Sequence, residues 1–191
     1  GTTDPCPSDA RNRCAGSIAI DGTTLLPIRI NASTASAECA GTKIDCNGDV
    51  WAGDFGYNFA KSNRTCNLGG GGEGCVITGI TTLFGCEDEE TEDIFQCEHY
   101  DDLTNAELAY TFDVPNGRYI VNLFFANILG GTAGVGSRLF DIVVEGALAY
   151  NDFDQVAAAG ASGRAVVRAV DVTVSDGNGL NIQFLHQLGD P

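Results

Sequence analysis

The sequence predicts an all-β protein, an antiparallel β-sandwich with a disulfide-rich loop region. Three observations lead to this prediction. The second half of the chain alternates apolar and polar residues with a period of two, which is typical of half-buried strands. The chain contains 25 glycines, which suit tight turns. It contains no methionine and only two lysines, Lys43 and Lys61, so several of the residues that favour helices are scarce.

The first strand is expected at residues 25–32, where Pro27 removes a backbone donor and favours an edge or a bulge. Five further strands follow the alternating pattern: 107–113, 118–126, 138–145, 165–174 and a strand beginning at Leu180. In the second of these, Tyr119, Val121, Leu123 and Phe125 share one face. Helical periodicity is missing, and only residues 155–161 could hold a short helical turn.

All eight cysteines lie within the first 97 of the 191 residues: Cys6, Cys14, Cys39, Cys46, Cys66, Cys75, Cys86 and Cys97. The number is even and no C-x-x-C pair occurs, which favours disulfides over a zinc site. Disulfides indicate an oxidising, extracellular compartment, and the sequons at Asn31 and Asn63 fit a secreted glycoprotein. Because short loops close most readily, we expect pairing in chain order, 6–14, 39–46, 66–75 and 86–97.

The distribution of cysteines and polar residues divides the chain into two segments. Residues 1–24 are polar, carry two cysteines and are expected to form a disulfide-stapled N-terminal arm. Residues 25–191 are expected to form the sandwich domain. The hydrophobic content of 43% is enough for a packed core.

The charge of the chain excludes several classes of partner. Ten basic and 26 acidic residues give a formal net charge of −16. Nucleic acid binding requires Lys and Arg to displace counterions, and anionic lipid surfaces also attract basic segments. No apolar run approaches the roughly 20 residues of a membrane helix. We therefore expect no nucleic acid partner and no membrane insertion.

Two acidic segments could serve as metal sites. Residues 45–49 (DCNGD) offer oxygens at alternate positions, as a calcium loop does, but lack the Gly and Glu of an EF-hand. A turn stapled by Cys46 explains them equally well. The run from Glu87 to Asp93 is expected to be a solvated loop whose charges repel one another. No cofactor is expected, and structural calcium remains the minor alternative.

Enzymatic chemistry is not expected. His99 and His186 are the only imidazoles, and no G-x-S-x-G motif is present for a hydrolase nucleophile. Carboxylates are plentiful, but nothing singles out a glycosidase pair. The sequence assigns no catalytic residue.

The order of several motifs resembles the malectin family over residues 25–191. The matching strings are IRINA (28–32), DFG (54–56) after Trp51, EHY (98–100), YTFDVPNGRYIVNLFFA (110–126), SRLFDIVVEG (137–146), FDQVAAAG (153–160) and the closing DP (190–191). The resemblance implies a jelly-roll-like sandwich close to the galactose-binding-domain architecture.

The resemblance also implies a carbohydrate site between loops at one end of the sandwich. The corresponding residues here are Phe55, Tyr57, Tyr100 and Asp190. Aromatic rings can cover the apolar face of a pyranose, and a carboxylate can accept hydrogen bonds from hydroxyls. The alternative is that these aromatics pack under the cysteine-rich loops. Trp51 fits a core position better than a stacking platform.

The chain departs from the family pattern in two places. The loop at residues 127–134 (NILGGTAG) lacks the aromatic pair of the family's lectin. The family also has another apolar strand after the DP motif, which pairs near the first strand. An edge left open in this way invites strand addition from another chain.

Two functions follow as hypotheses. The first is a secreted, non-catalytic, lectin-like module whose partner is a glycan. The second is an extracellular structural subunit that self-associates into a filament or surface layer by strand complementation between neighbours.

Overall fold

A computed structural model describes residues 18–20, 23–25, 27–33, 40–58, 61–63, 76–100 and 106–188. For residues 18–25 and 61–63 only the backbone is described. Among these residues, no helix is long and apolar enough to cross a membrane.

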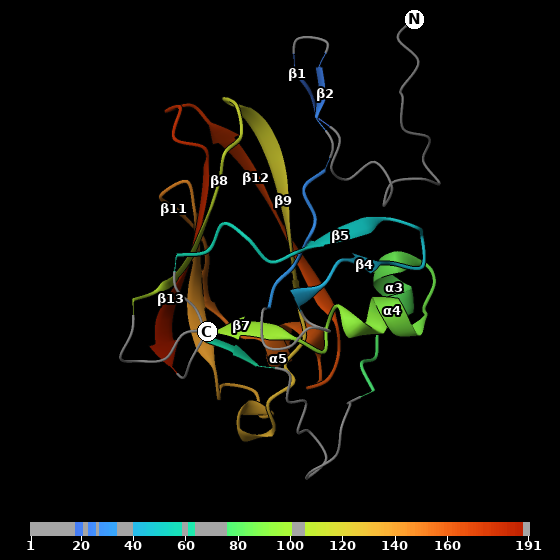
Figure 1. The fold of residues 1–191 in the computed structure, drawn as a ribbon. Helices are drawn as coiled ribbons and strands as arrows, with labels where there is room; N and C mark the ends of the chain where they lie inside the picture. Colours follow the sequence, from blue (N-terminus) through green and yellow to red (C-terminus); the bar gives the residue numbers. More distant parts are fainter. Residues whose placement is uncertain are drawn as a thin grey trace, which may run out of the picture.

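The sandwich is built from two antiparallel sheets in the second half of the chain (Figure 1). The larger sheet has the strand order β11-β10-β13-β8. Its strands are β8 (Leu108–Phe112), β10 (Leu139–Val144), β11 (Ala147–Phe153) and β13 (Leu180–Leu188). The smaller sheet pairs β9 (Gly117–Phe125) with β12 (Val166–Val174). The prediction of an antiparallel β-sandwich is therefore confirmed.

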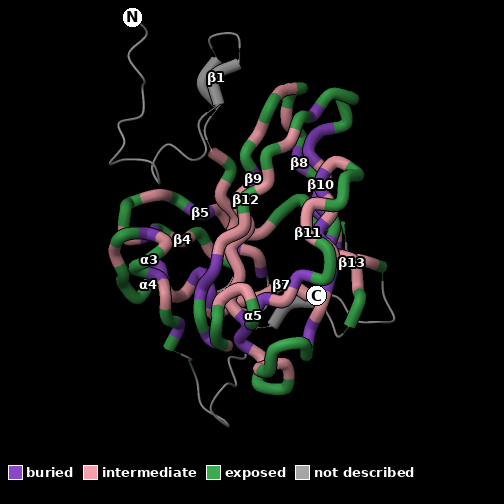
Figure 2. The backbone as a smooth tube through the Cα atoms, turned by 180° about the vertical axis from the view of Figure 1, so that it is seen from behind, coloured by how far each residue is buried: buried purple, intermediate pink, exposed green. Residues whose placement is uncertain are grey.

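The core of the sandwich lies between these sheets and follows the predicted alternation. Leu108, Tyr110 and Phe112 of β8 are buried. Every second residue of β10 is also buried, and Figure 2 shows buried and less buried positions along both strands. Apolar residues of β9 pack against the same core from the other sheet, among them Val121. The apolar faces that the two sheets turn toward each other are thereby removed from water. This burial is the main contribution to the free energy of folding of the sandwich.

The second region, which we call the lobe, comprises residues 40–58 and 76–100. Its elements are short: β4 (Lys43–Ile44), β5 (Val50–Gly53), α3 (Ile80–Phe84), α4 (Glu89–Asp93) and β7 (Glu98–Tyr100). β5 also pairs in parallel with β3 (Ile30–Asn31), and β7 pairs with β6 (Lys61–Asn63). Trp51 is 6% exposed and packs against Phe84 and against Phe124 of β9. Trp51 is thus a core residue, as predicted.

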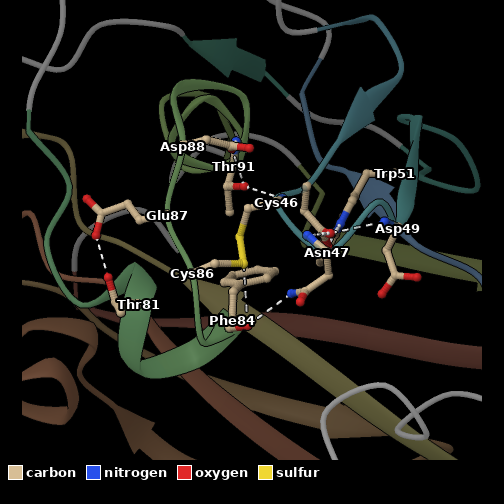
Figure 3. The surroundings of a disulfide bond; sticks show 11 residues. Cys46, Asn47, Asp49, Trp51, Thr81, Phe84, Cys86, Glu87, Asp88 and Thr91 are labelled. Carbon is tan, nitrogen blue, oxygen red and sulfur yellow. Dashed lines mark hydrogen bonds between the residues drawn. A yellow bond between two sulfur atoms is a disulfide. The ribbon is translucent and has the colours of Figure 1, made fainter. Parts of the chain in front are cut away.

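A disulfide between Cys46 and Cys86 joins the β4–β5 turn to the turn after α3 (Figure 3). The expected pairs 39–46 and 86–97 are therefore wrong. Cys97 also forms a disulfide, and the other five cysteines lie outside the described residues. Loop-closure entropy favours near neighbours, but the packing of Trp51 on Phe84 places two distant turns together.

The acidic run is a capped helix rather than the expected solvated loop. Asp88 caps α4 by accepting hydrogen bonds from the backbone N–H of Thr91 (2.8 Å) and from its hydroxyl (2.6 Å). These bonds lower the pKa of Asp88, the side-chain bond most strongly. Four of the remaining carboxylates, those of Glu87, Glu90, Glu92 and Asp93, bind groups elsewhere in the lobe. For example, Glu90 accepts from Ile44 N and Glu92 accepts from Ile77 N.

The remaining elements agree with the sequence only in part. A short helix, α5 (Gln155–Ala159), occupies the segment expected to hold a helical turn. A 3-10 turn, η1, spans Gly130–Thr132. The strand expected at 25–32 is interrupted: β2 (Thr23–Leu25) pairs with β1 (Ile18–Ile20), and β3 begins only at Ile30. The division into an arm at 1–24 and a sandwich at 25–191 stays a prediction.

Candidate ligand-binding site

The segment after β5 runs along the edge of the larger sheet beside β8. Thr111 N donates to Gly56 O at 2.7 Å, and Asn58 N donates to Ala109 O at 2.9 Å. Gly56 has φ 85°, and a Cβ there would meet Thr111 O at 2.8 Å. A glycine is therefore required for this segment to approach β8 so closely.

This segment presents two aromatic rings, Phe55 and Tyr57, which we call the aromatic ledge. Phe55 packs edge-on against Phe112 at 5.7 Å between ring centroids, and Tyr57 packs against Tyr110 at 6.4 Å. Phe55 is nevertheless 45% exposed and Tyr57 is 38% exposed. Both rings are therefore held by the sandwich and also accessible from outside.

A buried polar cluster of Asp54, His99 and Tyr110 lies next to the ledge. The Nδ1 atom of His99 lies 2.5 Å from Asp54 Oδ2 and 3.1 Å from the Tyr110 hydroxyl, which also donates to Asp54 Oδ2 at 3.3 Å. The imidazole contacts the Tyr57 ring edge-on at 4.6 Å. Burial, reinforced by Asp54, raises the pKa of Tyr110 far above its usual range. The cluster thus ties the ledge to β7 and β8.

The other two predicted sugar-binding residues are not placed on the ledge. Tyr100 follows His99 directly in β7, so its side chain is on the opposite face of the strand from the imidazole that contacts Tyr57. Asp190 lies outside the described residues. The structure therefore brings two of the four predicted residues together.

Of the two predicted sequon asparagines, only Asn31 has a side chain in the described part of the structure. Asn31 is fully buried in β3, so a glycan on it would displace the residues packed around it. Asn63 is paired with Glu98 in the β6–β7 ribbon, but its side chain lies outside the described part.

The candidate calcium loop is a hydrogen-bonded turn. Asp45 Oδ1 accepts from Asn47 N at 2.9 Å and from Asp49 N at 3.0 Å, while Oδ2 accepts from the indole N–H of Trp51 at 2.9 Å. No group of three His, Cys, Asp or Glu residues within the described ranges is arranged to hold a metal. The carboxylate oxygens of Asp45 therefore stabilise the turn. This agrees with the alternative interpretation of residues 45–49 as a structural turn at Cys46.

A cavity of about 710 Å³, lined by residues of the larger sheet, of β9 and of the lobe, was not anticipated from the sequence. Apolar core residues line most of it, and Glu98 and Arg138 line part of it. Arg138 Nη1 lies 3.7 Å from Glu98 Oε2. Burial raises the pKa of Glu98, and the neighbouring Arg138 opposes that effect. Glu98 belongs to the EHY motif, but no feature of the sequence indicates its pairing with Arg138.

Comparison with known proteins gives one family match and several distant relatives. A family model described as "Malectin domain" matches residues 35–188. A probable LRR receptor-like serine/threonine-protein kinase from Arabidopsis thaliana is 26% identical over 193 residues, which cover 94% of this chain.

The fold is similar to solved ectodomain structures. The ANXUR2 extracellular domain from Arabidopsis thaliana has a TM-score of 0.63 at 14% identity and covers 92% of this chain. A structure of the plant peptide RALF23 in complex with FER and LLG2 has a TM-score of 0.59 at 14% identity over 91% of this chain. The chain spans 16% of the kinase relative, 51% of the ANXUR2 chain and 49% of the chain matched in the peptide complex.

Proposed function

The chain belongs to the malectin domain family, and from that premise we propose that it is an extracellular, non-catalytic module that binds a glycan on its aromatic ledge. The observation that carries the proposal is the position of Phe55 and Tyr57. Both rings are partly exposed, yet each is packed on a core aromatic of β8.

Rigid, exposed aromatic rings suit a saccharide ligand. The C–H face of a pyranose is apolar and packs on a ring, which removes apolar surface of both partners from water. Since the ledge is already held by β8 and by His99, binding costs little additional ordering of these side chains. The Tyr57 hydroxyl would offer a hydrogen bond to a sugar hydroxyl at the same place.

The disulfide in the lobe supports an extracellular location. The Cys46–Cys86 disulfide persists in an oxidising compartment. The ANXUR2 structure is described as an extracellular domain. By analogy, this chain would present its ledge to ligands outside the cell.

Titration calorimetry with glucose and galactose oligomers tests the proposal. Phe55→Ala and Tyr57→Ala are each expected to weaken binding about fivefold, which corresponds to the loss of about 1 kcal/mol of aromatic packing. Tyr57→Phe, which keeps the ring, should retain most of the affinity. Leu148→Ala is a matched control, because Leu148 is 56% exposed on the distant strand β11. Unchanged affinity in both ledge variants would show that the site is elsewhere.

A further inference from the structure

The two rings of the ledge are held by different parts of the molecule. Among the described rings, Phe55 packs on Phe112 of β8 alone, at 5.7 Å between centroids. Tyr57 packs on two rings, and the imidazole of His99 is nearer, at 4.6 Å, than the ring of Tyr110, at 6.4 Å. The nearest described ring to Tyr57 therefore belongs to β7 of the lobe and not to the core of the sandwich.

The backbone of the ledge is fixed without His99. Tyr57 forms a β-bridge with Tyr110, and the residues on both sides of Tyr57 form backbone hydrogen bonds with β8. His99 contributes a contact to the Tyr57 ring and takes part in none of these backbone bonds. A change at residue 99 should therefore free the ring of Tyr57 while the chain around it keeps its path.

The His99 side chain is too deeply buried to touch a ligand. It is 1% exposed, and the side chain of Asp54 is 0% exposed. The Nδ1 atom of His99 lies 2.5 Å from Asp54 Oδ2, a contact that fixes the orientation of the imidazole. Asp54 thus orients the imidazole, and the imidazole in turn contacts the Tyr57 ring.

This arrangement of Asp54 and His99 is not the one that stability alone would favour. Asp54 Oδ1 and His99 Nε2 are both buried and have no hydrogen-bond partner in the described part of the chain. Burying polar atoms in this way costs free energy, and apolar side chains of similar volume often replace a buried ion pair without loss of stability. Departures of this kind concentrate at functional sites.

We propose that Asp54 and His99 are positioning residues of the glycan site, in which Asp54 orients the imidazole and the imidazole holds the Tyr57 ring in the orientation that meets the sugar. This inference rests on the proposed function of the ledge. It assigns part of the affinity to two buried side chains that the sugar does not touch. The Tyr57 ring is then ordered when the chain folds and not when the sugar binds.

His99→Asn removes the imidazole but keeps a donor for the carboxylate of Asp54. It should weaken the binding of glucose and galactose oligomers about fivefold in calorimetry, which corresponds to ordering one side chain. His186→Asn is the matched control, because His186 pairs with Glu107 at 2.9 Å and is not part of the cluster. Circular dichroism verifies that both variants fold. Wild-type affinity in His99→Asn would overturn the proposal.

Two substitutions of Asp54 test its part in the arrangement. Asp54→Asn keeps an oxygen that can accept from the imidazole and should retain most of the affinity. Asp54→Ala removes the acceptor and should weaken binding about as much as His99→Asn does. If Asp54→Ala folds and binds sugar as wild type does, Asp54 does not position the ring.

A double-mutant cycle separates positioning from a general loss of structure. If His99 acts through Tyr57, His99→Asn should weaken binding about fivefold in the wild-type background and not at all in Tyr57→Ala. In Phe55→Ala the substitution should keep its full effect, because Phe55 packs on Phe112 and not on the imidazole. Equal effects of His99→Asn in the wild-type and Tyr57→Ala backgrounds would overturn the proposal.

Nuclear magnetic resonance without sugar distinguishes this proposal from the glycan assignment. His99→Asn should shift the Tyr57 ring signals, while the amides of Asn58 and Thr111 stay protected from hydrogen exchange by their bonds between the ledge segment and β8. Sugar binding by the wild type together with unshifted Tyr57 signals in His99→Asn would overturn the positioning role alone. No sugar binding by the wild type would overturn the glycan site, and this proposal with it.

Discussion

The sandwich and the lobe achieve order by different means. Strands of the sandwich reach nine residues, and β9 pairs with β12 at every position from 117 to 125. Strands of the lobe have two to four residues, and its helices have five. There the Cys46–Cys86 disulfide and bonds such as Cys46 N to Thr91 Oγ1 (2.7 Å) supply the order. Repeating backbone pairing is therefore not the only way in which this chain specifies a structure.

The largest effect on stability is expected from truncating a side chain in the core of the sandwich. Phe140 is 1% exposed and its ring contacts those of Phe125, Phe153 and Phe184. Phe140→Ala should lower the free energy of unfolding by about 3–5 kcal/mol, because it leaves a cavity among close-packed rings. Urea titration followed by far-UV circular dichroism measures the loss. A decrease below about 1 kcal/mol would contradict the assigned core.

The next largest effect should come from removing the disulfide of the lobe. The bond closes a separation of 40 residues, so Cys46→Ser combined with Cys86→Ser should cost about 2–4 kcal/mol. Trp51 is the only tryptophan and is buried in the lobe, so its fluorescence reports on this region. We expect the fluorescence midpoint in urea to fall further than the circular dichroism midpoint. Equal shifts of both midpoints would show that the two regions unfold as one.

A smaller effect is expected from the cap of α4. Asp88→Ala removes the acceptor for the Thr91 backbone N–H and should cost about 1 kcal/mol. Because Thr91 also accepts from Cys46 N, the Trp51 fluorescence should again report the change first. Asp88→Asn keeps an acceptor and serves as the control. A loss in Asp88→Asn as large as that in Asp88→Ala would contradict a capping role.

The smallest effect is the pH dependence of the same cap. Its hydrogen bonds lower the pKa of Asp88, so the charged cap stabilises the fold fully above the ordinary aspartate value of about 3.9. That contribution is lost as the pH falls through the lowered pKa of the folded state. Asp88→Asn should therefore lose less stability than wild type between pH 5 and pH 2. Parallel urea midpoints for the two proteins across this range would contradict the assignment.

The sequence predicted the sandwich well because its strands are long enough to show their alternation. The shared face of Tyr119, Val121, Leu123 and Phe125 does border the core. The resemblance to malectin predicted the family correctly.

The lobe was predicted poorly because its order depends on contacts between distant residues. Nothing in the run from Glu87 to Asp93 shows that Glu90 binds the backbone of Ile44. Likewise, Cys46 and Cys86 are 40 residues apart in the sequence and pair in a region where Trp51 packs on Phe84.

The central claim is that the lobe and β8 together hold the aromatic ledge as a glycan-binding surface. Nuclear magnetic resonance of the protein with labelled aromatic rings, titrated with glucose and galactose oligomers, tests it most directly. We predict saturable shifts of the Phe55 and Tyr57 ring signals, with Tyr150 and the other distant rings unchanged. Saturable shifts confined to rings away from the ledge, or none at millimolar sugar, would contradict the claim.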